Sequence, residues 1–218
     1  MNTNWIFGVV AALALGGCAV KPPAKYDYTA FRQAKPRSIV VLPPLNESPD
    51  VEATSSVLSQ LTHPLAEAGY YVFPVTLVRE TFHQNGLDVA GDIQTVGADK
   101  LSQVFGADAA LYVTVSRYGT TYIVVDSVTT VAVSARLVDL KSGTVLWSGA
   151  ASASSNENSN NNSGGLVGAL VAAAVKQIIN QSTNAGYSMA GTASERLLAG
   201  GRQNGILYGP YSPKYGTD

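Results

Sequence analysis

The stretch Ser38-Ile39-Val40-Val41-Leu42-Pro43-Pro44 decides the fold of this 218-residue chain. Its continuous apolar and mostly β-branched residues, closed by two prolines, are typical of a short strand that is buried on both faces. Such a strand lies inside a sheet that carries helices on each side. The stretch therefore predicts an α/β domain, whose other elements should lie on either side of it in the sequence.

A helix is predicted over residues 51–68, where leucines recur on one face. Asp50 is its expected N-cap and Gly69 its expected end. Pro64 lies inside this helix and is expected to kink or divide it. A strand over 70–73 and two shorter helices follow. The first of these helices is expected to begin after the cap Thr76 and to end near Gly86, and the second to begin after the cap Asp99 and to end at Gly106.

From residue 109 onward the pattern changes from helices to strands. The predicted strands cover residues 109–115, 122–125, 131–138 and 144–150. Lys141-Ser142-Gly143 is the expected tight turn between the last two of them. The predicted fold class is therefore α/β (α+β), with a mixed sheet of about five strands, an antiparallel C-terminal meander, and flanking helices.

The C-terminal third begins with a polar Ser/Asn/Ala/Gly segment over 152–165, which is expected to be a mobile loop. Two helices are predicted after it, over 166–179 and 182–198. The tail, residues 201–218, carries Tyr208, Tyr211 and Tyr215 among glycines and prolines. Rigid aromatic side chains of this kind are suited to docking on a partner. The alternative is a frayed terminus.

The N-terminal apolar run from Trp5 to Leu15 is too short to span a bilayer and precedes Gly16-Gly17-Cys18. The pattern resembles the bacterial lipobox, which implies a signal peptide over 1–17 and lipidation of Cys18, the only cysteine. Its n-region lacks Lys and Arg, and the alternative is an apolar helix with an incidental cysteine. Because Ala19 and not Asp follows, the resemblance points to the periplasmic face of the outer membrane.

Residues 18–37 are expected to form the lipid anchor and a flexible tether, since the stretch holds three prolines and no apolar periodicity. At full stretch such a tether reaches about 60 Å. A single domain over 38–200 and the tail over 201–218 complete the predicted organisation. The membrane, reached through the lipid anchor, is the first expected partner.

Composition and motifs argue against catalysis and against nucleic-acid binding. The net charge is -1 and no basic run occurs, so nucleic acid is not an expected partner. His63 and His83 stand twenty residues apart without further ligands, so no metal and no cofactor are expected. Gly186-Tyr187-Ser188-Met189-Ala190 only approaches a nucleophile elbow and is expected to be helical. No catalytic residue is predicted, and the protein is not expected to be an enzyme.

Several motifs together resemble a known group of periplasmic domains. They are the strand end Leu42-Pro43-Pro44-Leu45-Asn46-Glu47-Ser48, the strand opener Gly106-Ala107-Asp108 and the hairpin from Arg136 to Trp147. They resemble the domain of TolB N-terminal regions, CsgG-type lipoproteins and the penicillin-binding-protein activator LpoB. The whole chain is similar to an uncharacterised family of bacterial outer-membrane lipoproteins that includes a neisserial vaccine-candidate antigen. The motifs indicate architecture and carry no chemistry.

The resemblance and the missing catalytic groups lead to one expected function and two alternatives. The expected function is that of a non-catalytic assembly or accessory lipoprotein in an outer-membrane transport or secretion complex. Its expected partners are other copies of itself and CsgG-like lipoproteins. The first alternative is an LpoB-like activator of a peptidoglycan synthase, and the second is a cryptic hydrolase that uses Ser188. A membrane hairpin over 128–150, as in CsgG-type pores, is the structural alternative to a soluble sheet.

Overall fold

The computed structural model describes residues 26–123, 126–157 and 185–218. Three sequence predictions lie outside these ranges. They are the signal peptide with Cys18, most of the polar loop over 152–165, and the helix over 166–179. None of the helices in the described part of the chain is both long and apolar enough to cross a membrane.

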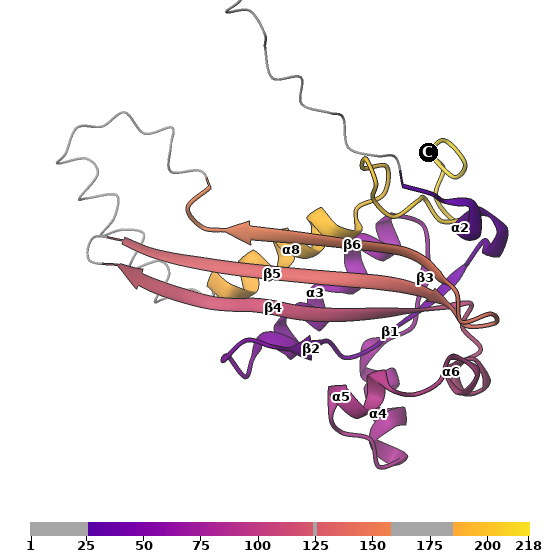
Figure 1. The fold of residues 1–218 in the computed structure, drawn as a ribbon, viewed down its shortest axis with the longest axis horizontal. Coiled ribbons are helices and arrows are strands. Elements are labelled where there is room, and N and C mark those ends of the chain that lie inside the picture. Colours follow the sequence, from indigo (N-terminus) through magenta and orange to yellow (C-terminus); the bar gives the residue numbers. More distant parts are fainter. Residues whose placement is uncertain (1–25, 124–125, 158–184) are drawn as a thin grey trace, which may run out of the picture.

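The described chain forms a six-stranded mixed sheet with helices on both faces, which confirms the predicted fold class (Figure 1). The strand order is β3-β1-β4-β5-β6, and β2 pairs with β4 outside this path. Neighbours among β1, β2, β3 and β4 are parallel, whereas β4, β5 and β6 form the predicted antiparallel meander. The strands are β1 (Ser38–Val41), β2 (Leu45–Asn46), β3 (Tyr71–Val72), β4 (Ala109–Ile123), β5 (Asp126–Asp139) and β6 (Val145–Ser154).

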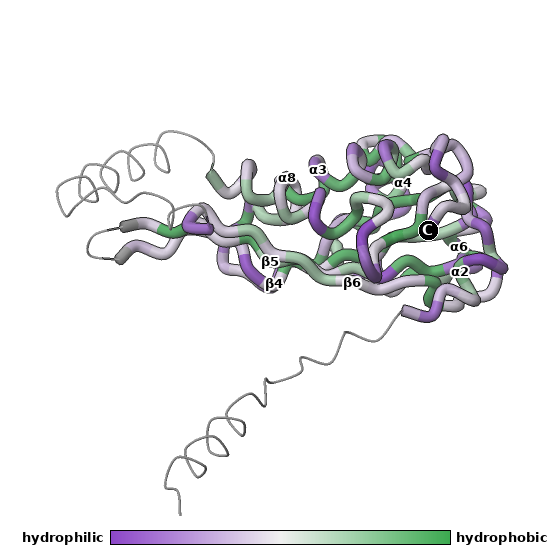
Figure 2. Tube along the Cα trace, turned by 90° about the horizontal axis from the view of Figure 1, so that it is seen from above, coloured by the Kyte–Doolittle hydropathy of each residue, from purple (hydrophilic) through white to green (hydrophobic). Residues whose placement is uncertain are grey.

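The prediction of separate strands over 109–115 and 122–125 is wrong, because β4 is one continuous strand of 15 residues. A bulge between Val115 and Arg117 shifts its register against β5, so the apolar alternation breaks there without ending the strand. Beyond the bulge, β4 and β5 stay paired up to Ile123 and Asp126, and this part of the two strands lies at the opposite end of the molecule from the C-terminus (Figure 2).

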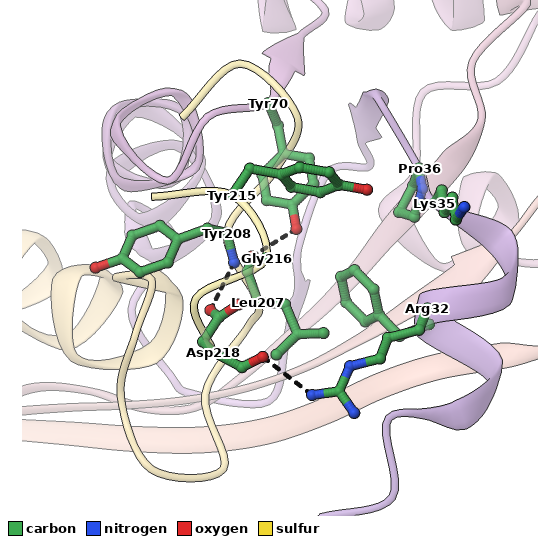
Figure 3. Close-up of a pocket in the computed structure, with 10 residues that line it drawn as sticks. Arg32, Lys35, Pro36, Tyr70, Leu207, Tyr208, Tyr215, Gly216 and Asp218 are labelled. Carbon is green, nitrogen blue, oxygen red and sulfur yellow. Dashed lines mark hydrogen bonds between the residues drawn. The ribbon is translucent and has the colours of Figure 1, made fainter. Parts of the chain in front are cut away.

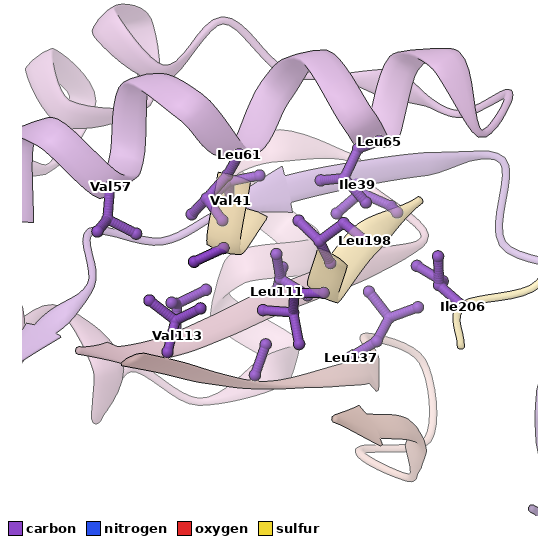
Figure 4. Packing of buried hydrophobic residues seen from close by; sticks show 14 of the residues in the cluster. Ile39, Val41, Val57, Leu61, Leu65, Leu111, Val113, Leu137, Leu198 and Ile206 are labelled. Carbon is purple, nitrogen blue, oxygen red and sulfur yellow. The ribbon is translucent and has the colours of Figure 1, made fainter. Parts of the chain in front are cut away.

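Side chains of the central strands point alternately to the two faces of the sheet and contribute to two apolar cores, one on each face. Ile39 and Val41 face α3 (Ala53–Glu67) and α8 (Ala185–Leu198), as Figure 4 shows. Val40 and Leu42 face the second core, which is covered by α4 (Val75–Gln84), α5 (Ala90–Gln94) and α6 (Ala98–Phe105). The prediction that the strand over 38–42 is buried on both faces is confirmed.

The membrane-hairpin alternative would require the apolar side chains of β5 to face lipid. In the structure Val131, Val133 and Leu137 are buried in the core beneath α3 and α8, together with Trp147 of β6. On the other face Arg136 lies over the ring of Tyr112, with 4.5 Å between the guanidinium carbon and the ring centroid. In this arrangement helices cover the apolar face of β5.

Of the two outcomes predicted for Pro64, a kinked or a divided helix, division does not occur, because α3 is one continuous helix. Pro64 lies three residues before the end at Glu67, where its missing N–H removes only one bond of the last turn. Its carbonyl still accepts the N–H of Ala68 at 2.9 Å. At the other end, the carboxylate of Asp50 accepts the N–H of Glu52 in the turn that precedes the helix. The helix begins at Ala53 with Glu52 as its N-cap, so the prediction of Asp50 as the N-cap is wrong.

Two of the motifs from the resemblance hold loops in place. The carboxylate of Asp108 accepts the backbone N–H of both Arg37 and Ser38, which ties the start of β1 to the start of β4. Asp139 accepts the backbone N–H and the hydroxyl of Ser142 in the β5–β6 turn. Both are folding roles, as expected from the sequence.

The prediction of a flexible tether up to residue 37 is wrong for residues 26–37. Helix α2 (Thr29–Ala34) forms there and buries Phe31 in the main core. Tyr26 packs against that core, and its hydroxyl accepts the N–H of Ser148 on the edge strand β6 at 3.1 Å. Aromatic anchors therefore order this segment despite its weak periodicity.

Candidate partner-binding site

The described tail does not fray but lies along the turn that follows α3. Ile206 and Leu207 are buried in the main core. The N–H of Gly209 then donates to the carbonyl of Ala68 at 2.8 Å, and the N–H of Tyr211 donates to that of Gly69 at 3.0 Å. The predicted boundary at residue 200 is therefore wrong, because the folded unit includes residues of the tail.

Two glycines allow this close backbone contact. Gly69 has a φ of +95°, and a Cβ on it would lie 2.3 Å from the backbone nitrogen of Ser212. A Cβ on Gly209 would lie 2.3 Å from the carbonyl oxygen of Gly69. The two chain segments can approach this closely only because neither residue carries a side chain.

A pocket of about 410 Å³ opens between the tail and α2 (Figure 3). Its lining is mostly aromatic and aliphatic, with charged groups at Arg32, Lys35 and Asp218. The remaining lining residues are Phe31, Pro36, Tyr70, Leu207, Tyr208, Tyr215 and Gly216. Pockets of this size and character are typical of small-molecule sites.

Hydrogen bonds fix the walls of this pocket. The hydroxyl of Tyr70 donates to the carbonyl of Leu207 at 2.6 Å, and burial raises the pKa of Tyr70, so the phenol stays a neutral donor. Arg32 Nη2 donates to the main-chain carbonyl of Asp218 at 3.0 Å. The Asp218 carboxylate accepts the N–H of Tyr208 at 2.8 Å. The tail and α2 are thereby joined across the pocket.

The structure places two of the three predicted tyrosines at this pocket. Tyr208 is half-buried against Gly200 and Gly201, and Tyr215 lines the opening with 48% of its surface exposed. Tyr211 is 67% exposed and is not among the lining residues. Sequence reasoning missed Arg32 in α2 and Lys35 at its C-cap, because residues 26–37 show no helical periodicity.

The other residues considered in the sequence lie on the surface. His63 Nδ1 of α3 donates to the carboxylate of Glu195 at 3.0 Å, and His83 of α4 is paired with Asp88. Ser188 lies exposed on α8, which confirms the prediction of a helix there. In the described ranges, no three His, Cys, Asp or Glu side chains are grouped so that they could hold a metal ion.

The imidazole of His83 is expected to titrate above the ordinary histidine pKa. The hydrogen bond to Asp88 is the main cause, with a smaller contribution from Glu80. Because the folded-state pKa is raised, the pair stabilises the fold fully below the ordinary histidine pKa, and this contribution is lost as pH rises through the raised value. Imidazole chemical shifts measured against pH test this, since Asp88→Asn should lower the midpoint. Equal midpoints would contradict it.

Comparison with known proteins identifies relatives over most of the chain. The model of the family described as "Putative lipoprotein GNA1162-like" matches residues 26–211. A relative from Neisseria meningitidis serogroup B, named "Putative lipoprotein NMB1124/NMB1162", is 55% identical over 205 residues, or 94% of each chain. The crystal structure of lipoprotein GNA1162 from Neisseria meningitidis is 57% identical, with a TM-score of 0.54, and covers 66% of this chain and 99% of that one.

A more distant likeness is to the C-terminal domain of LpoB from Salmonella enterica. It is 19% identical, with a TM-score of 0.40, and covers 58% of this chain and 91% of that domain. This likeness is too weak to carry an argument about function.

Proposed function

The chain belongs to the GNA1162-like family of lipoproteins, and on this premise we propose that it is a non-catalytic assembly component of an outer-membrane transport or secretion complex. In this proposal Cys18 carries the lipid, and the folded unit stands at the periplasmic face of the outer membrane. The partners are further copies of the protein or other outer-membrane lipoproteins of the CsgG-like type. One observation carries the proposal, namely that the tail is clamped to the fold and presents exposed tyrosines.

Clamping matters because a tail whose backbone is already ordered loses less conformational freedom on binding. The backbone of Tyr211 is held by its bond to Gly69, while its side chain remains 67% exposed. Tyr215 is 48% exposed at the neighbouring pocket. Tyrosines are enriched among the residues that dominate binding energy at protein interfaces. The tail therefore has the properties of a preformed docking surface.

The position of α2 favours partners near the membrane. Because residues 26–37 are folded, only seven residues lie between Cys18 and Tyr26, which are eight Cα–Cα steps apart. At full extension it reaches about 28 Å, roughly half the distance expected from the sequence. An activator anchored in the outer membrane must reach inward across the cell wall to a synthase. The shorter connection supports the assembly role over the synthase-activator alternative.

Replacing both Tyr211 and Tyr215 with alanine is expected to reduce the native size of the detergent-solubilised complex without unfolding the protein. The matched control replaces Tyr122 and Tyr187, which are similarly exposed at 63% and 43% but lie outside the tail. Native electrophoresis of outer-membrane extracts measures the result. The proposal predicts that only the tail variant shifts to monomer size. An unchanged complex, or an equal loss in the control, would overturn it.

The hydrolase alternative depends on Ser188, and a serine-directed probe is expected to leave this residue unlabelled. Ser188 lies in α8, where its carbonyl accepts the hydroxyl of Thr192, and the described residues place no histidine bond on its hydroxyl. Without a base, a serine hydroxyl is a weak nucleophile. Mass spectrometry of the treated protein measures labelling. A covalent adduct on Ser188 would reinstate the hydrolase.

A further inference from the structure

We propose that the pocket between α2 and the tail binds one acyl chain that ends in an anionic group. A fatty acid or an acyl chain of an anionic phospholipid has this chemistry. The inference goes beyond the docking role of the tail and does not depend on it, because binding can be measured on the unlipidated protein.

The interior of the pocket suits a hydrocarbon chain. Phe31 and Leu207 are almost fully buried at its base, and the ring of Tyr70 is buried beside them. The Tyr70 hydroxyl already donates to the carbonyl of Leu207, so a ligand does not have to accept a hydrogen bond from it. An apolar ligand in this space would displace water without leaving these polar groups unpaired.

The mouth of the pocket suits an anion. The ammonium of Lys35 makes no ion pair or hydrogen bond with any described residue, although Lys35 lines the opening. The Asp218 carboxylate also lines the pocket, but it is held by the N–H of Tyr208 and forms no ion pair with Lys35, so the lining carries two cations and one carboxylate side chain. Arg32 directs one nitrogen to the Asp218 carbonyl and retains further donors. A carboxylate or phosphate at this position would pair with Lys35.

The backbone of Lys35 gives an independent reason to connect this residue with function. It caps α2 in the left-handed region, with a φ of +46°. Glycine commonly takes this position because any other side chain there is strained. Strained residues tend to occur at functional sites, where the strain is tolerated for the sake of the side chain. A lysine at this cap therefore agrees with a role for its side chain at the pocket.

The location of the pocket explains how such a ligand would be encountered. The pocket lies beside α2, only a short stretch of chain after Cys18. The segment 19–37 holds five basic residues and one acidic residue. Each basic residue close to an anionic membrane surface adds roughly 1 kcal/mol of attraction. The same end of the molecule thus combines an attraction for anionic headgroups with an apolar pocket.

The test uses the mature-length chain carrying Cys18→Ala, without its signal peptide, and a fluorescent palmitate as the probe. Dodecanoate is expected to displace the probe at a concentration about tenfold lower than dodecanol, because only the acid can pair with Lys35. Lys35→Gln should remove this preference and Lys35→Arg should retain it. Lys141→Gln, which changes an exposed cation in the β5–β6 turn, is the matched control and should have no effect.

Lys35→Gly separates binding from folding. Glycine removes the charge and also relieves the left-handed strain, so dodecanoate affinity should fall while the melting temperature stays level or rises. A loss of binding accompanied by a lower melting temperature would indicate a structural role for Lys35 and would overturn the proposal. Absence of probe binding, or equal displacement by the acid and the alcohol, would also overturn it.

Vesicles distinguish the two sources of the acyl chain. If Lys35-dependent binding extends to phosphatidylglycerol vesicles and not to phosphatidylcholine vesicles, the ligand is a membrane phospholipid. If it is confined to dodecanoate, the ligand is a free fatty acid. Each result supports the proposed chemistry. If the lipidated protein excludes the probe while the Cys18→Ala protein binds it, the protein's own anchor fills the pocket, and the proposal of an external ligand is wrong.

Discussion

Gly69→Ala is expected to destabilise the fold by about 3 kcal/mol. The left-handed backbone conformation of Gly69, with φ +95°, costs an alanine roughly 1–2 kcal/mol. Its Cβ would also overlap the backbone of Ser212, and forcing such a contact apart typically costs about 1–3 kcal/mol more. Urea denaturation of the unlipidated protein measures the loss.

The control for this prediction is Gly86→Ala at the end of α4. Gly86 has a similar φ of +77°, but nothing lies within 4 Å of the Cβ that would be added. It should therefore show the backbone strain alone, roughly 1–2 kcal/mol. Equal losses in the two variants would contradict the close contact between the tail and Gly69.

The same substitution should release the tail before the rest of the fold. The N–H of Tyr211 is protected by the carbonyl of Gly69, so its hydrogen exchange should accelerate strongly in Gly69→Ala. Amides of β4 and β5, at the centre of the sheet, should respond only to the change in global stability. This local effect would connect the glycine directly with the docking surface.

Cys18→Ala is expected to remove the protein from the membrane or leave it as uncleaved precursor. Each buried methylene of an acyl chain contributes about 0.8 kcal/mol to membrane binding, and two chains together anchor a protein stably. Fractionation of cell envelopes and the mass of the N-terminal peptide measure the outcome. Gly17→Ala, which keeps a small residue before the cysteine, should still mature. A Cys18→Ala protein that fractionates with the outer membrane would contradict the anchor.

The fold could be predicted from the sequence where apolar periodicity was strong. The apolar patterns of residues 38–42 and 131–138 predicted strands, and leucines at helical spacing predicted α3. The errors in predicting secondary structure lie where a bulge or a glycine interrupted the apolar periodicity. A bulge interrupted the alternation of β4 without ending it, and α5 contains Gly91, which obscured a helix of only five residues.

The candidate site was only partly predictable, because it joins two segments that lie far apart in the sequence. The tyrosines of the tail were identified from composition. Arg32 and Lys35 were assigned to a tether, since prolines dominate that stretch and α2 has only six residues. The available signal was the aromatic series Tyr26, Tyr28 and Phe31, which in the structure anchors the segment to the main core. Sequence patterns report local structure well and distant packing poorly.

Photo-crosslinking in living cells tests the central claim most directly, with the crosslinking residue placed at Tyr211 and, as control, at Tyr122. The tail surface is proposed to dock on outer-membrane lipoproteins or on a second copy of the chain. The account predicts adducts from Tyr211 that contain this protein itself or another outer-membrane lipoprotein, and none of these adducts from Tyr122. Recovery of inner-membrane peptidoglycan synthases alone would contradict it.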